Sequence, residues 1–172
     1  MWRFNPVYSP SILELSKDLR HVKHKGAEPG STDTEERDWG AALCSLSTQR
    51  TFTVRILRNP SNSNLEVGMF HLDGLYHVTG FKTLAWTLNM DYQLDKAWDH
   101  EKDEEYKGKR ILEGSVVSVH IEDKRRMLTF KVNGEEVYSN VKTSLPPEKF
   151  SRLVAGVVMF FKDDEVEIID PE

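Results

Sequence analysis

The sequence predicts an all-β protein, a sandwich of two antiparallel sheets with about eleven or more strands. Three observations support this: apolar and polar residues alternate with a period of two in most segments, no long segment keeps a helical period, and turn-forming residues recur at short intervals. The 172 residues, 38% of them hydrophobic, suffice for one substantial core. We therefore expect a single domain over residues 1–172, with residues 1–11 as an N-terminal extension and residues 12–170 as the sandwich.

In the first half of the chain the clearest strand is Thr51 to Leu57, whose apolar residues occupy alternate positions and share one face. The stretch 59–64, rich in Asn, Pro and Ser, is typical of a turn. Alternation resumes over Leu65 to Met69, so we expect these two strands to form an antiparallel pair. Weaker strand candidates are Ser11 to Leu15, Arg20 to His24, Trp39 to Leu46 and Thr83 to Asn89.

In the second half the alternation predicts a series of hairpins. Val117 to Ile121 and Leu128 to Val132 flank a charged turn, and Asn133-Gly134 is the dipeptide that best supplies two positive φ angles for a type I′ turn. A third strand is expected to fold back from that turn. Leu153 to Phe161 and Glu165 to Ile169 are separated by three residues and are expected to pair as a last hairpin.

The apolar positions of these strands predict the core between the two sheets. Its main members are expected to be Phe52, Val54, Ile56, Val67, Met69, Val117, Val119, Ile121, Leu128, Phe130, Val157 and Met159. Cys44 lies among apolar residues of a strand candidate, where a thiol packs as a small hydrophobe rather than acting as a nucleophile.

Composition excludes several function classes. The 23 Lys and Arg against 28 Asp and Glu give a formal net charge of −5, opposite in sign to that of a nucleic-acid or anionic-membrane binder. The longest apolar run, Leu153 to Phe161, is far shorter than the roughly 20 residues of a membrane span, and Met1 to Pro10 lacks a secretory-signal pattern. A single cysteine allows no internal disulfide. We expect an intracellular, cytoplasmic protein, a monomer on its own, that binds neither nucleic acid nor membrane.

The histidines do not form a metal-site pattern. His21 and His24 are three positions apart, which places them on opposite faces of a strand, and both are expected at the surface. A site built from His71, Asp73 and His77 is disfavoured, since residues of one mobile loop are seldom preorganised. The sequence also lacks nucleophile-elbow, phosphate-loop and His-Glu-x-x-His patterns. We therefore expect no enzyme activity, no metal and no cofactor.

Two adjoining segments resemble the signature of the SPRY domain family. Glu113 to Asp123 opens a strand with Gly and closes it with an acid, and Met127 to Gly134 contains a Leu-x-Phe-x-x-Asn-Gly hairpin. Further segments similar to strands of the family are Phe52 to Ile56, Leu65 to Met69, Ala85 to Leu88, Val154 to Phe161 and Glu165 to Ile168. The family often has a tryptophan near the position of Phe52.

The resemblance implies a bent sandwich, related to lectin-like jelly rolls, that serves as a non-catalytic protein-interaction module. Ligands of the family are peptides or protein surfaces received by loops at one rim, in keeping with the rule that rigid scaffolds carry function on their connections. We therefore expect a protein or peptide ligand. The alternative from another class is a lectin-like carbohydrate-binding module, in which an aromatic side chain such as Trp98 stacks on a sugar.

The predicted binding site combines aromatic and acidic residues of the connections within 72–109 with the last turn. Aromatic side chains outside the strand pattern supply contact area. Residues 95–105 carry six acids against two lysines, which favours a basic partner over calcium, because the stretch lacks the Gly of an EF-hand loop. The resemblance adds Phe81 and Phe161 as pocket positions. The candidate partner-binding residues are Tyr76, Phe81, Tyr92, Trp98, Asp99, Glu101, Tyr106 and Phe161, and segments 72–82, 92–109 and 161–164 are expected to form one rim.

Overall fold

A computed structural model describes residues 1–26, 40–60, 65–71, 85–96, 99–102 and 108–171. Its strands are β1 (Leu13–Leu15), β2 (His21–His24), β3 (Gly40–Leu43), β4 (Thr51–Arg58), β5 (Glu66–His71), β6 (Ala85–Asn89), β7 (Gln93–Lys96), β8 (Asp99–Lys102), β9 (Val116–Glu122), β10 (Met127–Val132), β11 (Glu135–Lys142), β12 (Leu153–Met159) and β13 (Glu165–Ile169). Two short helices are η1 (Pro6–Tyr8), a 3-10 helix, and α1 (Pro147–Phe150). Within these ranges no helix has the length and apolar character that crossing a membrane requires.

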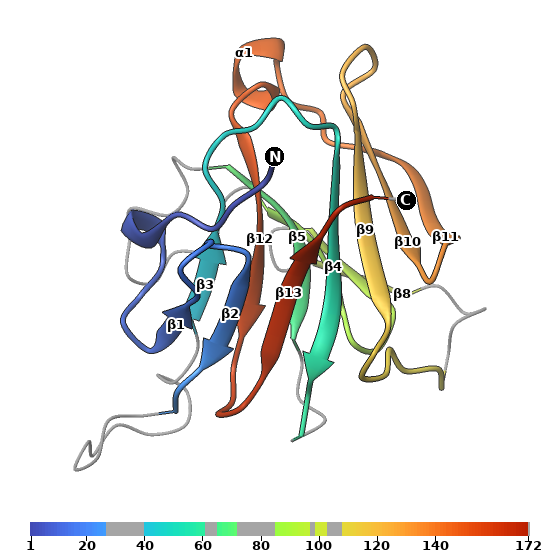
Figure 1. Cartoon of the computed structure of the whole chain (residues 1–172). Coiled ribbons are helices and arrows are strands. Elements are labelled where there is room, and N and C mark those ends of the chain that lie inside the picture. The colour runs from blue at the N-terminus through green and yellow to red at the C-terminus, as the bar shows by residue number, and fades with distance from the viewer. Residues whose placement is uncertain (27–39, 61–64, 72–84, 97–98, 103–107, 172) are drawn as a thin grey trace.

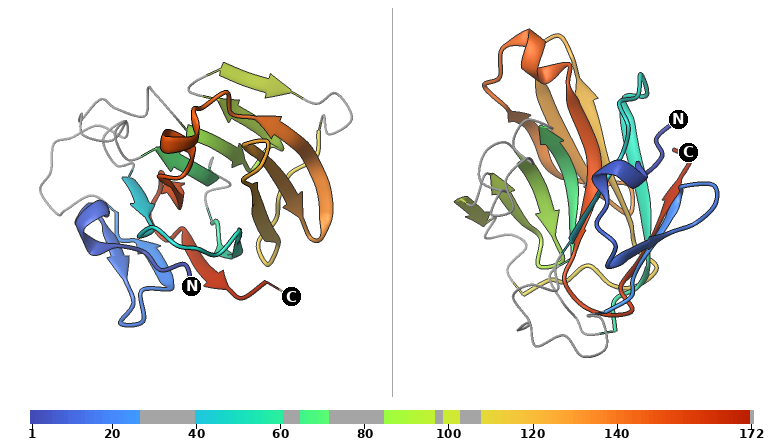
Figure 2. Two further views of the ribbon diagram at one scale, coloured as in Figure 1. Left: turned by 90° about the horizontal axis from the view of Figure 1, so that it is seen from above. Right: turned by 90° about the vertical axis from the view of Figure 1, so that its left-hand side faces the viewer.

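The strands form two antiparallel sheets that lie face to face (Figures 1 and 2). The seven-stranded sheet has the order β1-β2-β13-β4-β9-β10-β11, and the six-stranded sheet has the order β3-β12-β5-β6-β7-β8. The predicted fold class, an all-β sandwich of two antiparallel sheets, is confirmed. The alternating strands bury one face each against the other sheet, which is why the period of two was informative.

The hairpins predicted around Asn133-Gly134 are also confirmed. β9 pairs with β10 from Val117↔Val132 to Glu122↔Met127, and β10 continues into β11. Asn133 and Gly134 have φ angles of 50° and 83°, as a type I′ turn requires. The Asn133 side chain also accepts a hydrogen bond from the Val116 amide at 2.8 Å, which ties the turn to the start of β9.

Two other predicted pairings are wrong. β4 lies between β13 and β9 in one sheet, whereas β5 lies between β12 and β6 in the other. β12 and β13 are likewise in different sheets. Both connections therefore cross from one layer to the other. A short turn between two alternating segments has the same composition in either case, and the surface that each strand buries decides where it pairs.

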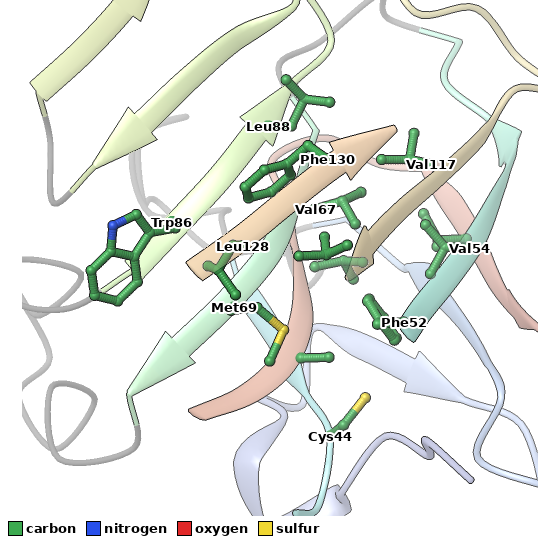
Figure 3. Close-up of a cluster of buried hydrophobic side chains, with 14 of the residues drawn as sticks. Cys44, Phe52, Val54, Val67, Met69, Trp86, Leu88, Val117, Leu128 and Phe130 are labelled. Atoms are coloured by element: carbon green, nitrogen blue, oxygen red, sulfur yellow. The ribbon is translucent and has the colours of Figure 1, made fainter. Parts of the chain in front are cut away.

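The core fills the space between the sheets (Figure 3). Every predicted core residue from Phe52 to Met159 is buried, with exposed fractions of 3% or less. Cys44 is fully buried in the same cluster, as expected. Residues 1–11, expected as an extension, contribute Trp2 and Phe4 to this core, and Trp2 packs edge-on against Phe52 with 6.0 Å between ring centroids.

A smaller apolar cluster lies on the other face of the six-stranded sheet. It contains Phe70, Val154 and Val158, which alternate along β5 and β12 with residues of the main core. These two strands are therefore buried on both faces, which explains why β12 reads as a continuous apolar run in the sequence.

Candidate functional site

The eight predicted site residues fall into three groups. Tyr76, Phe81, Trp98 and Tyr106 lie outside the described residues, so for them the site stays a prediction. Asp99 and Glu101 belong to β8, and Tyr92 and Phe161 lie in connections between strands.

The acidic stretch after Tyr92 was expected to be a loop. It includes instead two strands, β7 and the edge strand β8. β8 pairs with β7 from Gln93↔Lys102 to Lys96↔Asp99. Its sequence, Asp-His-Glu-Lys, has no apolar alternation because an edge strand need not bury a face. Charged residues at a sheet edge also oppose pairing with a second chain. A strand composed of charged residues carries no alternation of apolar and polar positions, so the sequence did not predict it.

The two ends of the sandwich carry different predicted segments. β12 runs from Leu153 to Met159, a length of about 20 Å. Phe161 lies just beyond the C-terminal end of this strand. We call this end of the molecule the Phe161 end. Leu153 pairs with His71, so the strand ends that flank residues 72–84 lie at the opposite end. The expectation that segment 72–82 and Phe161 form part of the same rim stays a prediction.

Tyr92 lies at the Phe161 end. Glu66, at the start of β5, pairs with Val158 on one side and with Asn89 on the other, and Asn89 immediately precedes the tight turn that contains Tyr92. The structure thus brings the turns of Tyr92 and Phe161 to the same end of the six-stranded sheet, separated by β5.

The turn at Tyr92 is held by side chains around it. Asn89 Oδ1 accepts hydrogen bonds from the amides of Asp91 at 2.9 Å and Gln93 at 3.1 Å, and the Tyr138 hydroxyl donates to the Tyr92 carbonyl at 2.8 Å. These contacts hold Tyr92 at a φ of 58°, a region that bulky residues seldom adopt. Burial, and secondarily the charge of Glu135, raises the pKa of Tyr92. Tyr92 packs on the core, and its role in partner binding stays a prediction.

Phe161 is 42% exposed and lies in the connection between β12 and β13. A fully buried carboxylate, Asp164, organises this connection. Asp164 Oδ1 accepts a hydrogen bond from Asn59 Nδ2 at 2.9 Å, and Oδ2 accepts one from the Phe161 amide at 3.4 Å. The backbone of Asp164 also accepts from the amide of His24 at 2.9 Å.

The hydrogen-bond network continues from Asn59 to Glu113, whose chain neighbour Leu112 is a second exposed apolar residue. The Asn59 amide donates to Glu113 Oε1 at 2.7 Å. Leu112, next to Glu113, is 65% exposed. A continuous network of Glu113, Asn59 and Asp164 therefore supports Leu112 and Phe161, and we call these five residues the rim frame. The connections of β4, β9 and β13 meet here, at the lower end of the molecule in Figure 1.

The sequence did not single out four of the five residues of the rim frame. Asn59 and Asp164 appeared there as ordinary turn residues, and their hydrogen bond joins positions 105 residues apart. Glu113 was noted only as part of a strand opening, and Leu112 carried no pattern at all. The sequence alone does not show that an acidic residue in a turn is buried. Its burial becomes evident only when the structure shows its hydrogen-bond partners.

Metal-ligating side chains are dispersed over the residues that the structure describes. No three His, Cys, Asp or Glu side chains gather there as metal ligands. His24 is buried rather than at the surface, because it follows Val22 with a period of two on the inner face of β2, and its Nδ1 accepts a hydrogen bond from the Gly26 amide. Asp73 and His77 lie outside the described residues. Burial raises the pKa of the Cys44 thiol, which disfavours its nucleophilic thiolate.

Solved structures with the same architecture are SPRY domains. The SPRY domain of human HERC1 superimposes with a TM-score of 0.67 at 17% sequence identity, covering 98% of each chain. A second human SPRY domain gives a TM-score of 0.68 at 16% identity over 94% of this chain and 98% of that chain. The TRIM65 PSpry domain gives 0.64 at 15% identity over 99% of this chain and 90% of that chain. No protein-family model and no curated protein matches the sequence.

Proposed function

We propose that this chain, which has the fold of SPRY domains, is a non-catalytic protein-interaction module that binds a peptide or protein surface at the Phe161 end. The observation that carries the proposal is the rim frame. It presents two large exposed apolar side chains, Leu112 and Phe161, on loops joined by hydrogen bonds of 2.7 and 2.9 Å.

A rigid support of this kind favours binding for an energetic reason. Ordering a loop on association costs free energy, and a loop already held in place avoids most of that cost. Exposed aromatic and aliphatic side chains then supply desolvated contact area, the usual source of hot-spot energy. Loops on a rigid sandwich are a common place for such surfaces.

The remaining predicted residues complete the proposal. Tyr76, Phe81, Trp98 and Tyr106 would extend the aromatic surface, whereas Asp99 and Glu101 on the edge strand β8 favour a basic partner. Charges at the margin of an interface act mainly on the association rate. We further propose that the chain acts in the cytoplasm as a monomer and has no enzyme activity.

The test uses immobilised protein and a cell lysate, with captured proteins identified by mass spectrometry and then purified for kinetics. Phe161→Ala and Leu112→Ala are compared with Leu46→Ala. Leu46 is the matched control because it is 55% exposed and lies between β3 and β4, at the other end of the sandwich. We expect Phe161→Ala to weaken a captured partner by about 2 kcal/mol, chiefly through faster dissociation, and Leu46→Ala to leave it unchanged.

Equal capture by the wild type and the Phe161→Ala, Leu112→Ala double variant, with both proteins folded, would refute the proposed site. Asp99→Asn with Glu101→Gln is expected to slow association and to reduce its salt dependence. Saturable, calcium-dependent retention on a glycan array, without a protein partner, would instead support the lectin-like alternative.

A further inference from the structure

A second surface lies on the outer face of the seven-stranded sheet. It is a groove of ≈ 590 Å³ lined by β4, β9, β10, β11 and the end of β13, strands that lie side by side in Figure 1. It is distinct from the rim frame, none of whose five residues lines it. Its lining alternates along each strand with core residues such as Val54, Val117 and Phe130.

The strand register places Arg55, Ser118 and Lys131 around one point of the groove floor. Ser118 on β9 pairs with Thr53 on β4 and with Lys131 on β10. Arg55 lies two residues beyond Thr53, on the same face. With strands about 4.8 Å apart and about 6.7 Å between alternate residues, the Cα atoms of Arg55 and Lys131 are roughly 12 Å apart. Both long side chains can therefore reach an atom above Ser118.

Side chains at the margin of the groove already have partners. At the margin of the groove, Thr51 bonds with His120 at 2.9 Å, and Asp170 forms an ion pair with Arg20 at 2.9 Å. Within the part of the chain that the structure describes, the side chains of Arg55, Ser118 and Lys131 make no hydrogen bond or ion pair. They thus leave two cations and one hydroxyl donor available at the centre.

Four arginines elsewhere are ion-paired with acids, whereas Arg3, Arg58 and Arg126, like Arg55, make no ion pair among the described residues. Ion pairs join Arg20, Arg50 and Arg110 to aspartates at 2.8 to 2.9 Å and Arg125 to Glu122 at 3.7 Å. Glu167 and Glu136 stand opposite Arg55 and Lys131 in the register, yet neither pair comes within ion-pair distance. Glu136 also lines the groove, but Arg55 and Lys131 have no ion-pair partner among the described residues, and their positive charge over Ser118 is available to an outside anion.

We propose that this groove binds a phosphorylated side chain of a peptide, with its phosphate held by Arg55, Lys131 and Ser118. A phosphate monoester carries close to two negative charges and three acceptor oxygens, which match two cations and a hydroxyl. Arg donates to two such oxygens at once, and Lys acts as a point charge. A carboxylate supplies only one charge.

The size and composition of the groove favour a peptide as the carrier of the phosphate. A volume of ≈ 590 Å³ exceeds what one phosphate fills and leaves room for flanking residues. Thr51 and Asn133 line its two ends and can hydrogen-bond to peptide groups. The described lining contains no Phe, Tyr or Trp, and its one imidazole, His120, is hydrogen-bonded to Thr51 at the margin, so the centre of the groove offers no stacking platform for a sugar or a base.

The test is an NMR titration of the ¹⁵N-labelled chain with a Gly-rich peptide that contains one phosphoserine. We expect saturable shifts of the amide signals of Ser118 and Lys131, and a loss of affinity of about tenfold or more in Arg55→Gln and in Lys131→Gln. Lys124→Gln is the matched control, since Lys124 is an exposed cation of the β9–β10 turn outside the groove. Phe161→Ala should bind as the wild type does, because the two sites are separate.

Three comparison ligands determine the outcome. The unphosphorylated peptide should not bind, and the same peptide with glutamate in place of phosphoserine should bind at least about tenfold more weakly. Equal binding of the glutamate peptide overturns the phosphate assignment. Free O-phosphoserine that binds as tightly as the peptide overturns the peptide part and leaves a small phosphate ester as the ligand. Unchanged affinity in folded Arg55→Gln and Lys131→Gln, or no saturable shift at millimolar peptide, overturns the site itself.

Discussion

The carboxyl group of Glu66 is hydrogen-bonded to that of Asp95 on the outer face of the six-stranded sheet. Glu66 lies on β5 and Asp95 on β7, and Thr87 of the intervening β6 donates its hydroxyl to Glu66 Oε1 at 3.1 Å. Two carboxyl groups can share a hydrogen bond only if one of them keeps its proton. Burial, the hydrogen bond to Asp95 and the charge of Asp95 together raise the pKa of Glu66 to about 9.

This pair predicts that the protein loses stability as the pH rises. The pKa of Glu66 is raised from 4.5 to about 9 on folding, so the folded state binds a proton that the unfolded state releases between these values. The contribution is fully present below pH 4.5 and is lost as pH rises toward 9. We expect the free energy of unfolding to fall with a slope of at most about 1.4 kcal/mol per pH unit, measured by urea unfolding between pH 5 and 9.

Glu66→Gln separates this effect from other titrations, because the amide keeps the shape of the protonated carboxyl but cannot ionise. The variant should show a flatter pH profile and exceed the wild type in stability near pH 9. Glu14→Gln, at an exposed position of β1, should keep the wild-type profile. Parallel profiles of the wild type and Glu66→Gln would show that the pair does not hold a proton.

A second prediction concerns the buried carboxylate of the rim frame. In Asp164→Asn one carboxylate oxygen becomes an NH2 group, which leaves one of the two donors, Asn59 Nδ2 or Phe161 N, without an acceptor. We expect the free energy of unfolding to fall by about 2 to 3 kcal/mol, the range for an unsatisfied buried donor next to a lost charged acceptor. Urea unfolding at pH 7 measures it. The neighbouring Asp163→Asn, at a partly exposed aspartate, should change stability by no more than about 0.5 kcal/mol.

A third prediction compares two glycines. A Cβ on Gly68 would lie 1.9 Å from the Trp86 carbonyl oxygen of the adjacent strand, whereas a Cβ on Gly134 would meet no atom within 4 Å. Gly68→Ala must therefore displace the backbone of β6 and should cost about 3 kcal/mol or more. Gly134→Ala carries only the cost of a positive φ, about 1 kcal/mol. Thermal unfolding should rank the two variants in this order, and the reverse order would contradict the close packing of β5 on β6.

A fourth prediction concerns Cys44, whose thiol is fully buried and whose pKa is raised by burial. Ellman's reagent should not react with the native protein on the time scale of minutes, and reaction should follow global unfolding in guanidinium. Ser45→Cys provides the control, since position 45 is exposed and its thiol should react at once. Rapid labelling of Cys44 in the native wild type would mean that the core opens locally around β3.

Part of the proposed binding site was predicted from the sequence, and part emerged only from the structure. Phe161 was expected from the resemblance to the SPRY family, and the structure finds it exposed in the connection before β13. Leu112 was not expected, because a single leucine outside an alternating segment carries no signal of its exposure. The groove around Ser118 was missed for a related reason: its residues are ordinary polar positions of regular strands, and only the pairing of β4, β9 and β10 places two unpaired cations beside one hydroxyl.

The sequence by itself determined the strongly alternating strands β4, β5, β9 and β10, the face that each of them buries between the sheets and the turn at Asn133-Gly134, because these depend on side-chain period and local backbone preference within a few residues. Only the tertiary structure decided that β4 pairs with β13 and β9 rather than with β5, that Asn59 meets Asp164, and that Glu66 lies against Asp95. Each of these depends on which surfaces come together when the two sheets pack. Local alternation specifies that a strand has a face to bury, but not the surface against which it is buried.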